Sequence, residues 1–158
     1  MHTCTPNWSV LRRAVVPQHI TSQDGGFYVG GMKGEFAKVG YFGQGTNATG
    51  LGTIQTGVWK DGRMEGRGIK FLPDLALYEG NFREGKQSGL GTYYFVDGGM
   101  FIGKFRNGLE HGHGTKWYPN GGKQTGKWEY GKLNGKAKTI FPDGRVLEGV
   151  FADGKYVE

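Results

Sequence analysis

The sequence predicts an all-β protein, a single-layer, elongated, twisted antiparallel sheet of about five to six consecutive β-hairpins. Glycine supplies 32 of the 158 residues, and aromatic residues make up 14% of the chain. Flexible glycine-rich chains are poor in aromatic residues because they bury nothing, so this combination indicates tight turns and close packing in a folded protein. The second observation is a repeat of 23 residues. Such a period is the signature of a repeat architecture.

Glycine and aromatic residues carry the period. The repeated glycines are Gly34, Gly57, Gly80, Gly103, Gly126 and Gly149, each 23 residues after the last. Two residues beyond each glycine stands an aromatic: Phe36, Trp59, Phe82, Phe105, Trp128 and Phe151. We therefore expect units that start near 32, 55, 78, 101, 124 and 147, with no insertion between them.

Each unit contains the turn chemistry of a β-hairpin. Asp-Gly and Asn-Gly pairs mark two turns per unit, because these residues tolerate positive φ. The first turn is marked by Asp61-Gly62, Asn107-Gly108 and Asp153-Gly154, and the second by Asp97-Gly98, Asn120-Gly121 and Asp143-Gly144. Side chains alternate along a strand, so Tyr78, Gly80 and Phe82 share a face. We expect each aromatic ring to cover glycines of a neighbouring hairpin.

The chain divides into an N-terminal segment, residues 1–26, and a repeat array, residues 27–158. The segment has no acidic residue before Asp24, and it contains a short basic, partly apolar stretch from Trp8 to Val16. Three interpretations stay open: a cap over the first hairpin, a tail, or an organelle-targeting sequence.

Composition limits the class of protein. Cys4 is the single cysteine, so no internal disulfide framework forms. No apolar run approaches the roughly 20 residues of a membrane span or resembles a secretory signal. We expect a cytoplasmic protein.

Chemistry-bearing residues are few. His111 and His113 lie two apart on one expected strand, but zinc requires three or four ligands and no third residue recurs nearby. The Gly-x-Gly pairs are followed by no helix and no Gly-Lys-Ser/Thr, so they are not phosphate loops. We expect no enzyme activity, no cofactor, no metal and no nucleic-acid partner.

Lysines concentrate in one stretch, residues 115–140. They are Lys116, Lys123, Lys127, Lys132, Lys136 and Lys138, against Glu129 alone. Repetition could align them on one face and attract an anionic membrane or an acidic protein surface. The alternative is a solubilising surface that protects strand edges.

The repeat resembles a known family. The stretch from Tyr78 to Tyr93 follows the pattern Y-E-G-x-[WF]-x-x-G-x-x-x-G-x-G of the MORN repeat, and Phe101 to Gly114 follows it again. The resemblance covers roughly residues 30–158. Gln55 and Gln124 replace the leading aromatic, and Val39 replaces a turn glycine.

The resemblance implies a non-enzymatic scaffold or adaptor with cytoskeletal or ciliary partners, and homodimers are also known in the family. It also leaves two alternatives: phosphoinositide or other anionic-membrane binding, and a module that regulates an enzyme in trans. Regularly spaced aromatics on an elongated ribbon offer a surface to an extended or helical partner. We expect this surface to comprise Trp59, Tyr78, Phe82, Phe101, Phe105, Trp117 and Trp128.

Overall fold

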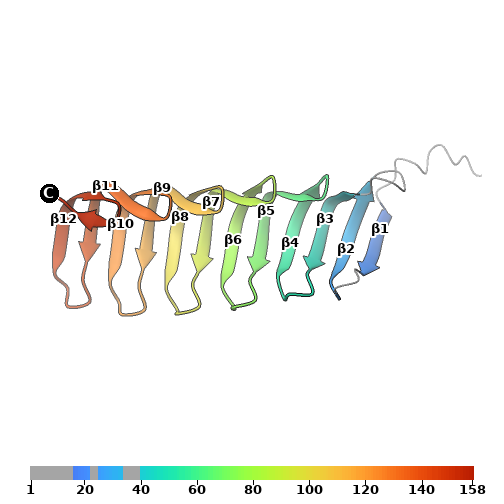
Figure 1. Cartoon of the computed structure of the whole chain (residues 1–158), viewed down its shortest axis with the longest axis horizontal. Coiled ribbons are helices and arrows are strands. Elements are labelled where there is room, and N and C mark those ends of the chain that lie inside the picture. The colour runs from blue at the N-terminus through green and yellow to red at the C-terminus, as the bar shows by residue number, and fades with distance from the viewer. Residues whose placement is uncertain (1–15, 22–24, 34–39) are drawn as a thin grey trace, which may run out of the picture.

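The computed structural model describes residues 16–21, 25–33 and 40–158. In these residues the chain forms one antiparallel sheet in which each strand pairs with its neighbours in chain order (Figure 1). The predicted all-β, single-layer array of hairpins is confirmed. The strands are β1 (Val16–Thr21), β2 (Phe27–Lys33), β3 (Gly40–Ala48), β4 (Ile54–Lys60), β5 (Arg63–Phe71), β6 (Leu77–Arg83), β7 (Lys86–Tyr94), β8 (Met100–Arg106), β9 (Leu109–Trp117), β10 (Lys123–Glu129), β11 (Lys132–Ile140), β12 (Val146–Ala152) and β13 (Lys155–Tyr156).

Two kinds of turn alternate along the array. The tight turns hold two residues at positive φ, for example Asn107 at 52° and Gly108 at 87°, which is the backbone of a type I′ hairpin turn. The wide loops hold five residues. In the four wide loops after β5, β7, β9 and β11, an Asp or Asn side chain accepts a hydrogen bond from a backbone N–H two residues on, as Asp97 does from Gly99 at 2.8 Å. The turns predicted from Asp-Gly and Asn-Gly pairs are therefore present.

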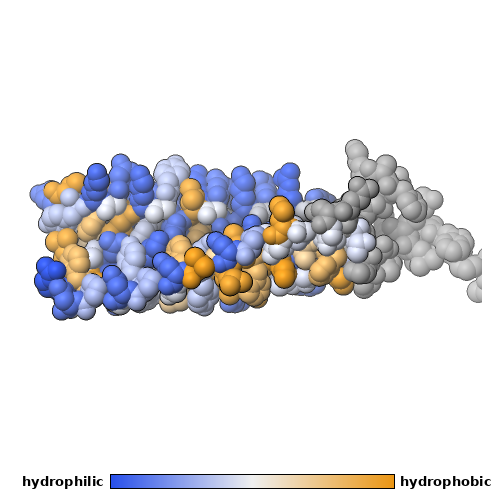
Figure 2. All heavy atoms as spheres, turned by 60° about the horizontal axis from the view of Figure 1, so that its bottom comes forward, coloured by the Kyte–Doolittle hydropathy of each residue, from blue (hydrophilic) through white to orange (hydrophobic). Residues whose placement is uncertain are grey.

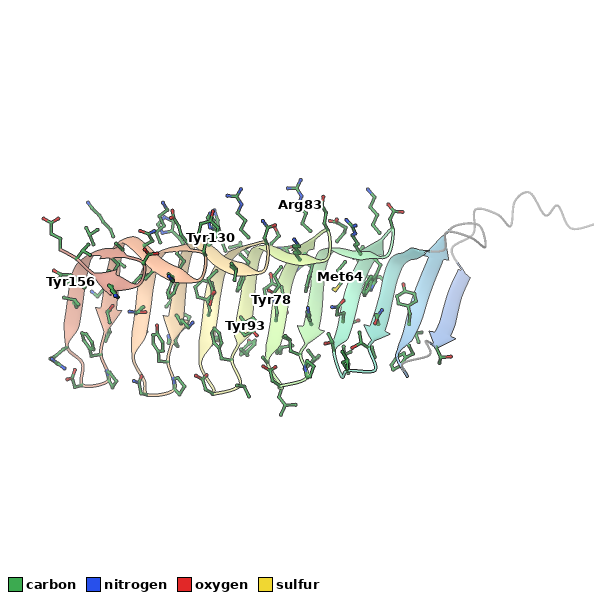
Figure 3. All side chains as sticks on the ribbon, in the orientation of Figure 1. Met64, Tyr78, Arg83, Tyr93, Tyr130 and Tyr156 are labelled. Carbon is green, nitrogen blue, oxygen red and sulfur yellow. The ribbon has the colours of Figure 1, made fainter. Side chains whose placement is uncertain are left out.

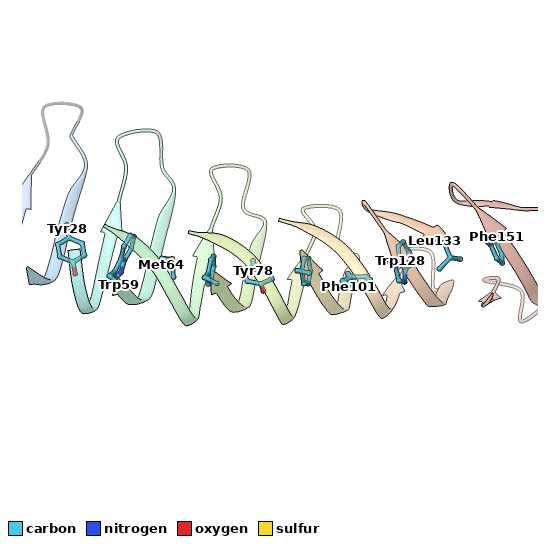
Figure 4. Packing of buried hydrophobic residues seen from close by; sticks show 10 residues of the cluster. Tyr28, Trp59, Met64, Tyr78, Phe101, Trp128, Leu133 and Phe151 are labelled. Carbon is cyan, nitrogen blue, oxygen red and sulfur yellow. The ribbon is translucent and has the colours of Figure 1, made fainter. Parts of the chain in front are cut away.

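The core lies on one face of the sheet, which we call the inner face. Its buried side chains follow one another in a row along the array (Figure 4). They are Tyr28, Trp59, Met64, Tyr78, Phe82, Phe101, Phe105, Trp128, Leu133 and Phe151. A single layer can bury these side chains because each large side chain covers glycines of the strands beneath it.

Tyr78 shows the arrangement most clearly (Figure 3). Gly80 and Gly91 are register partners on β6 and β7, and a methyl group built on either would collide with the Tyr78 ring. The Tyr78 hydroxyl donates a hydrogen bond to the carbonyl of Asn81 at 2.9 Å. Burial raises the pKa of this hydroxyl to about 12. Tyr78 thus covers glycines of its own hairpin, whereas we expected each ring to cover a neighbouring hairpin; Phe82 does reach Gly68 of the adjacent hairpin. We call a side chain in the place of Tyr78 a lid.

The second aromatic of each unit joins neighbouring hairpins. Phe105 packs edge-on against the Tyr78 ring at 5.0 Å and against Phe101 at 5.3 Å, and Trp128 packs against Phe101 at 5.3 Å. The indole of Trp128 also donates a hydrogen bond to the carbonyl of Gly114 at 3.1 Å. Edge-to-face aromatic pairs add about 0.5–1.5 kcal/mol each beyond their buried area, so the repeats stabilise one another through this chain of rings.

Units that lack a leading aromatic take their lid from the other strand. Gln55 stands where Tyr78 stands in its unit, and there the Met64 side chain covers Gly57 and Gly68. Met64 is 1% exposed. Leu133, equally buried, holds the same position in the unit of Gln124. Where the leading aromatic is present, this second position is polar: it holds Gln87 beside Tyr78 and Glu110 beside Phe101.

The first repeat unit does not lie where the 23-residue period predicts it. Gly30 pairs with Gly45 and lies under Tyr28, as Gly80 and Gly91 lie under Tyr78. These partners are 15 residues apart, where Gly80 and Gly91 are 11 apart, so the first hairpin is four residues longer. The glycine of the first unit is therefore Gly30 and the period of 23 does not extend to Gly34. Phe36, Val39 and Gly34 lie outside the described residues.

The N-terminal segment contributes a strand. β1 pairs antiparallel with β2 over Val16–Thr21, so this part of residues 1–26 covers the edge of the first hairpin as a cap would. The rest of the proposed targeting sequence, residues 1–15, lies outside the described residues.

The packing of lids on glycines predicts the cost of a side chain at Gly91. Gly91→Val places a branched side chain against the Tyr78 ring, whereas Leu90→Ala trims a side chain that is 63% exposed on the opposite face. We expect Gly91→Val to lower the free energy of unfolding by about 3 kcal/mol or more and Leu90→Ala by under about 1 kcal/mol. Urea unfolding measures both, and equal losses would contradict the packing.

The exchange of lids between strands predicts a rescue. Met64→Gln should cost about 2–4 kcal/mol, because it uncovers Gly57 and Gly68. Adding Gln55→Tyr should recover at least half of that loss, because a tyrosine there repeats the Tyr78 arrangement. The matched control is Gln55→Tyr with Met64 retained, which should itself destabilise by about 1–3 kcal/mol through overpacking. Strictly additive effects in this double-mutant cycle would refute the shared position.

Candidate functional site

The aromatic set expected to bind a partner is core instead. Six of its seven members are at most 5% exposed: Trp59, Tyr78, Phe82, Phe101, Phe105 and Trp128. A sheet whose glycines lie under aromatic rings uses those rings to fold, so they offer no surface to a partner. This expectation is therefore wrong for six residues. Trp117 differs, because it is half-buried on the opposite face of the sheet, which we call the outer face.

The outer face carries a continuous row of apolar side chains beside the wide loops. Register pairs connect its members on consecutive strands from β4 to β9. We call this the apolar row; it comprises Ile54, Phe71, Leu77, Tyr94, Met100 and Trp117. Ile54, Phe71 and Tyr94 are each more than 40% exposed, and the other three are half-buried. Lys123 interrupts the row on β10, and Ile140 and Val146 continue it.

A second row on the outer face is basic. On the same face, four residues along the strand from the apolar row toward the tight turns, several strands carry a basic side chain. We call these exposed residues the basic row: Arg67, Lys104, Lys127 and Lys136. Arg67, Lys104 and Lys136 make no ion pair with any described residue, whereas Lys127 lies 2.8 Å from Glu129. That contact holds the pKa of the Glu129 carboxyl below its usual value.

Small polar residues separate the two rows. Thr92, Thr115 and Thr125 lie between them, and the hydroxyls of Thr115 and Thr125 are 3.0 Å apart. Ile69 and Ile102 lie in the same position on β5 and β8. Glu79, which is exposed, holds this position on β6, between Ile69 and Thr92. Asn81 and Leu90 occupy the place of the basic row on β6 and β7. The outer face therefore presents an apolar row, a mixed row that includes one carboxylate, and an interrupted basic row.

One of the six lysines predicted to form a patch lies on the inner face of the sheet. Lys116 lies on the inner face, where its ammonium group is 4.3 Å from the centre of the Phe95 ring and 3.5 Å from Glu110. Lys132 and Lys138 form ion pairs with Asp153 and Glu148. Including Lys127, four of the six lysines have an acidic partner, and only Lys123 and Lys136 have none. Lys123, Lys127, Lys136 and Lys138 lie on the outer face of the neighbouring strands β10 and β11.

The wide loops carry exposed aliphatic side chains that sequence reasoning missed. Leu51, Leu75 and Val96 are 85%, 84% and 67% exposed on three consecutive loops. Figure 2 shows apolar side chains at this edge and hydrophilic ones along the tight-turn edge. Leu75 has a φ of 70° where the next loop has Gly98 at 88°. A leucine in the left-handed region is strained, so its replacement of the loop glycine was a signal in the sequence.

No catalytic or metal-binding constellation occurs among the described residues. They contain no group of three or more His, Cys, Asp or Glu side chains arranged to hold a metal. His113 lies in line with the basic row, and the His111 ring packs on Tyr130 at 6.0 Å. An open pocket of about 220 Å³ between two wide loops is lined by Tyr118, Gln124, Phe141 and their neighbours, with no carboxylate, histidine or cysteine. In the same residues no helix is long and apolar enough to cross a membrane.

The chain resembles solved structures that share little sequence identity with it. No curated protein sequence matches it. The TCP domain of SAS-4 (dCPAP) of Drosophila melanogaster, solved with a proline-rich motif of Ana2 (dSTIL), matches with a TM-score of 0.45 and 15% identity, over 96% of this chain and 97% of that one. The TCP10 domain of Danio rerio CPAP matches with a TM-score of 0.44 and 19% identity, over 87% of this chain and 72% of that one. Neither likeness bears on function.

The repeat itself matches a family model. The MORN repeat model matches four consecutive segments, residues 56–74, 78–100, 101–123 and 125–144, which together make up more than half of the chain. Each segment corresponds to one hairpin of the array and its wide loop, with the glycines under the lids and the tight-turn glycines in register. The chain belongs to the MORN-repeat family.

Proposed function

We propose that this protein is a non-enzymatic scaffold or adaptor that binds a protein partner on the outer face of its sheet. The observation that carries the proposal is the apolar row, which crosses six neighbouring strands and has three side chains more than 40% exposed. A sheet face with contiguous apolar side chains is usually buried against a second layer. Large exposed apolar strips of this kind mark interaction sites.

Folding does not require the outer face to be covered. The inner face already buries the lids and the chain of aromatic rings, and the hairpins pair with one another from β1 to β13. The apolar row is therefore available to a partner while the array stays folded.

The ion pairs of the lysines support a protein partner over an anionic membrane. Four of the six lysines expected to bind lipid headgroups have an acidic neighbour, so their attraction to a charged bilayer is reduced. A cytoskeletal or ciliary setting, and a regulatory role in trans, belong to this proposal through the family resemblance alone. Both would use the same face.

Site-specific photo-crosslinking tests the proposal. A photoreactive amino acid replaces Ile102 on the outer face or, as a matched control, Leu109 beside a tight turn; each side chain is 45% exposed. In the cells where the protein occurs, we expect position 102 to crosslink to a specific protein and position 109 to give at least fivefold less of that adduct. The adduct should disappear when Phe71 and Tyr94 are changed to serine.

Two outcomes would refute the proposal. One is an adduct that forms equally from both positions or survives the serine changes, with melting temperatures showing that the variants are folded. The other is no protein adduct, together with sedimentation on phosphoinositide vesicles that is abolished by changing Lys127, Lys132 and Lys136 to glutamate. That result would establish the membrane alternative.

A further inference from the structure

We propose that the partner segment on the outer face is an amphipathic α-helix with an acidic flank, lying across the strands along the array. This inference rests on the proposed function and names the chemistry of the partner. In this pose the apolar side of the helix contacts the apolar row, and its acidic flank faces the basic row.

Backbone pairing favours a helix over an extended peptide. In the described residues, strands β2 to β12 each pair with a strand on both sides, so the outer face within the array presents no free strand edge to a peptide strand. A peptide that lies across this face must satisfy its own backbone groups. A helix does so internally, whereas an extended peptide leaves them to water or buries them unpaired.

The spacing of the array matches the spacing of a helix. Neighbouring strands are about 4.8 Å apart, so equivalent residues of successive hairpins are about 9.6 Å apart. Seven residues of α-helix rise about 10.5 Å. One heptad therefore advances nearly one hairpin, and the difference is small over the five strand-to-strand steps from Ile54 on β4 to Trp117 on β9. That span of about 24 Å corresponds to about 16 helical residues.

The width of the face also fits a helix. The apolar and basic rows are four residues apart along each strand, for example Phe71 and Arg67 on β5, or Met100 and Lys104 on β8. Four residues of a strand span about 13 Å, and a helix with its side chains is about 10–12 Å across. Thr92 and Thr115 lie beneath the helix axis in this pose, in one row with Ile69, Glu79 and Ile102.

The charge on the face determines the sign of the flank. Within the span from β4 to β9, Arg67 and Lys104 are exposed and lack ion-pair partners among the described residues. The exposed Glu79 lies between the two rows on β6. Glutamate or aspartate on the side of the helix away from the apolar row would lie beside Arg67 and Lys104. Opposite charges arranged this way direct the helix to one orientation on the face and raise its association rate.

A second copy of the chain fits the face less well. A twofold axis parallel to the strands would place one basic row directly against the other. A twofold axis along the array that superposes the two apolar rows would leave both basic rows outside the contact. Neither homodimer uses both rows, whereas a separate acidic helix does.

Peptide display with a matched counter-selection tests the inference. A library of randomised 20-residue peptides is selected on the full chain and on a variant with Arg67 and Lys104 changed to glutamate. The control variant changes Lys60 and Arg106 to glutamate; these exposed residues lie at the tight turns and carry the same total charge. Circular dichroism and thermal melting confirm that both variants are folded.

We expect the selected peptides to share a heptad of apolar residues with Glu or Asp along one flank, and to gain helical circular dichroism when they bind. Fluorescence anisotropy should show at least tenfold weaker binding to the basic-row variant and less than twofold change with the tight-turn variant. Phe71→Ser with Tyr94→Ser should also weaken binding at least tenfold.

Three results would overturn the inference: selected peptides that are extended or basic, binding unaffected by the basic-row variant, or no enrichment over that variant. Each leaves the crosslinking test of the proposed function intact, because an adduct from position 102 requires a protein on the face and not a helix. Binding of the chain to phosphatidylserine vesicles that competes with the selected peptides would instead assign the face to a membrane.

Discussion

The structure depends on the contact between a large side chain and a pair of glycines on neighbouring strands. Tyr78 over Gly80 and Gly91 is the clearest example, because no side chain larger than hydrogen fits beneath the ring. This contact gives a single layer of sheet a buried interior, which two layers normally supply. It also couples each hairpin to the next, since the rings that follow the lids pack edge-on against them.

Because the buried core lies on the inner face, folding does not depend on covering the outer face. The apolar row and the basic row both lie on the outer face, and the pairing of neighbouring strands fixes the register of their side chains. A rigid, regularly spaced face of this kind suits recognition of a long, straight partner better than chemistry at a point. Leu75 is exposed at the wide-loop edge and has a left-handed backbone conformation, where the next repeat has a glycine. It is a departure from the repeat between two of the strands that carry the apolar row.

The fold was predictable because turn and strand patterns act between residues that are close in sequence. Features that depend on contacts between strands were missed. Turn dipeptides and alternation gave the hairpins, because both act within a few residues. The lids of two units could not be found this way, since Met64 and Leu133 come from the strand opposite Gln55 and Gln124. The first unit was misplaced because Gly34 continues the period by coincidence. The aromatic period marked core residues, and the partner surface became visible only when register aligned side chains from different repeats.

Chemical footprinting with a carbene reagent tests most directly which face is buried. The account predicts strong modification of Trp117 on the outer face and at least tenfold weaker modification of Trp59 and Trp128, which are 4% and 2% exposed. Peptide mass spectrometry resolves the three tryptophans, and unfolding in urea should make them equally reactive. Modification of Trp59 and Trp128 as strong as that of Trp117 in the folded protein would contradict the placement of the core.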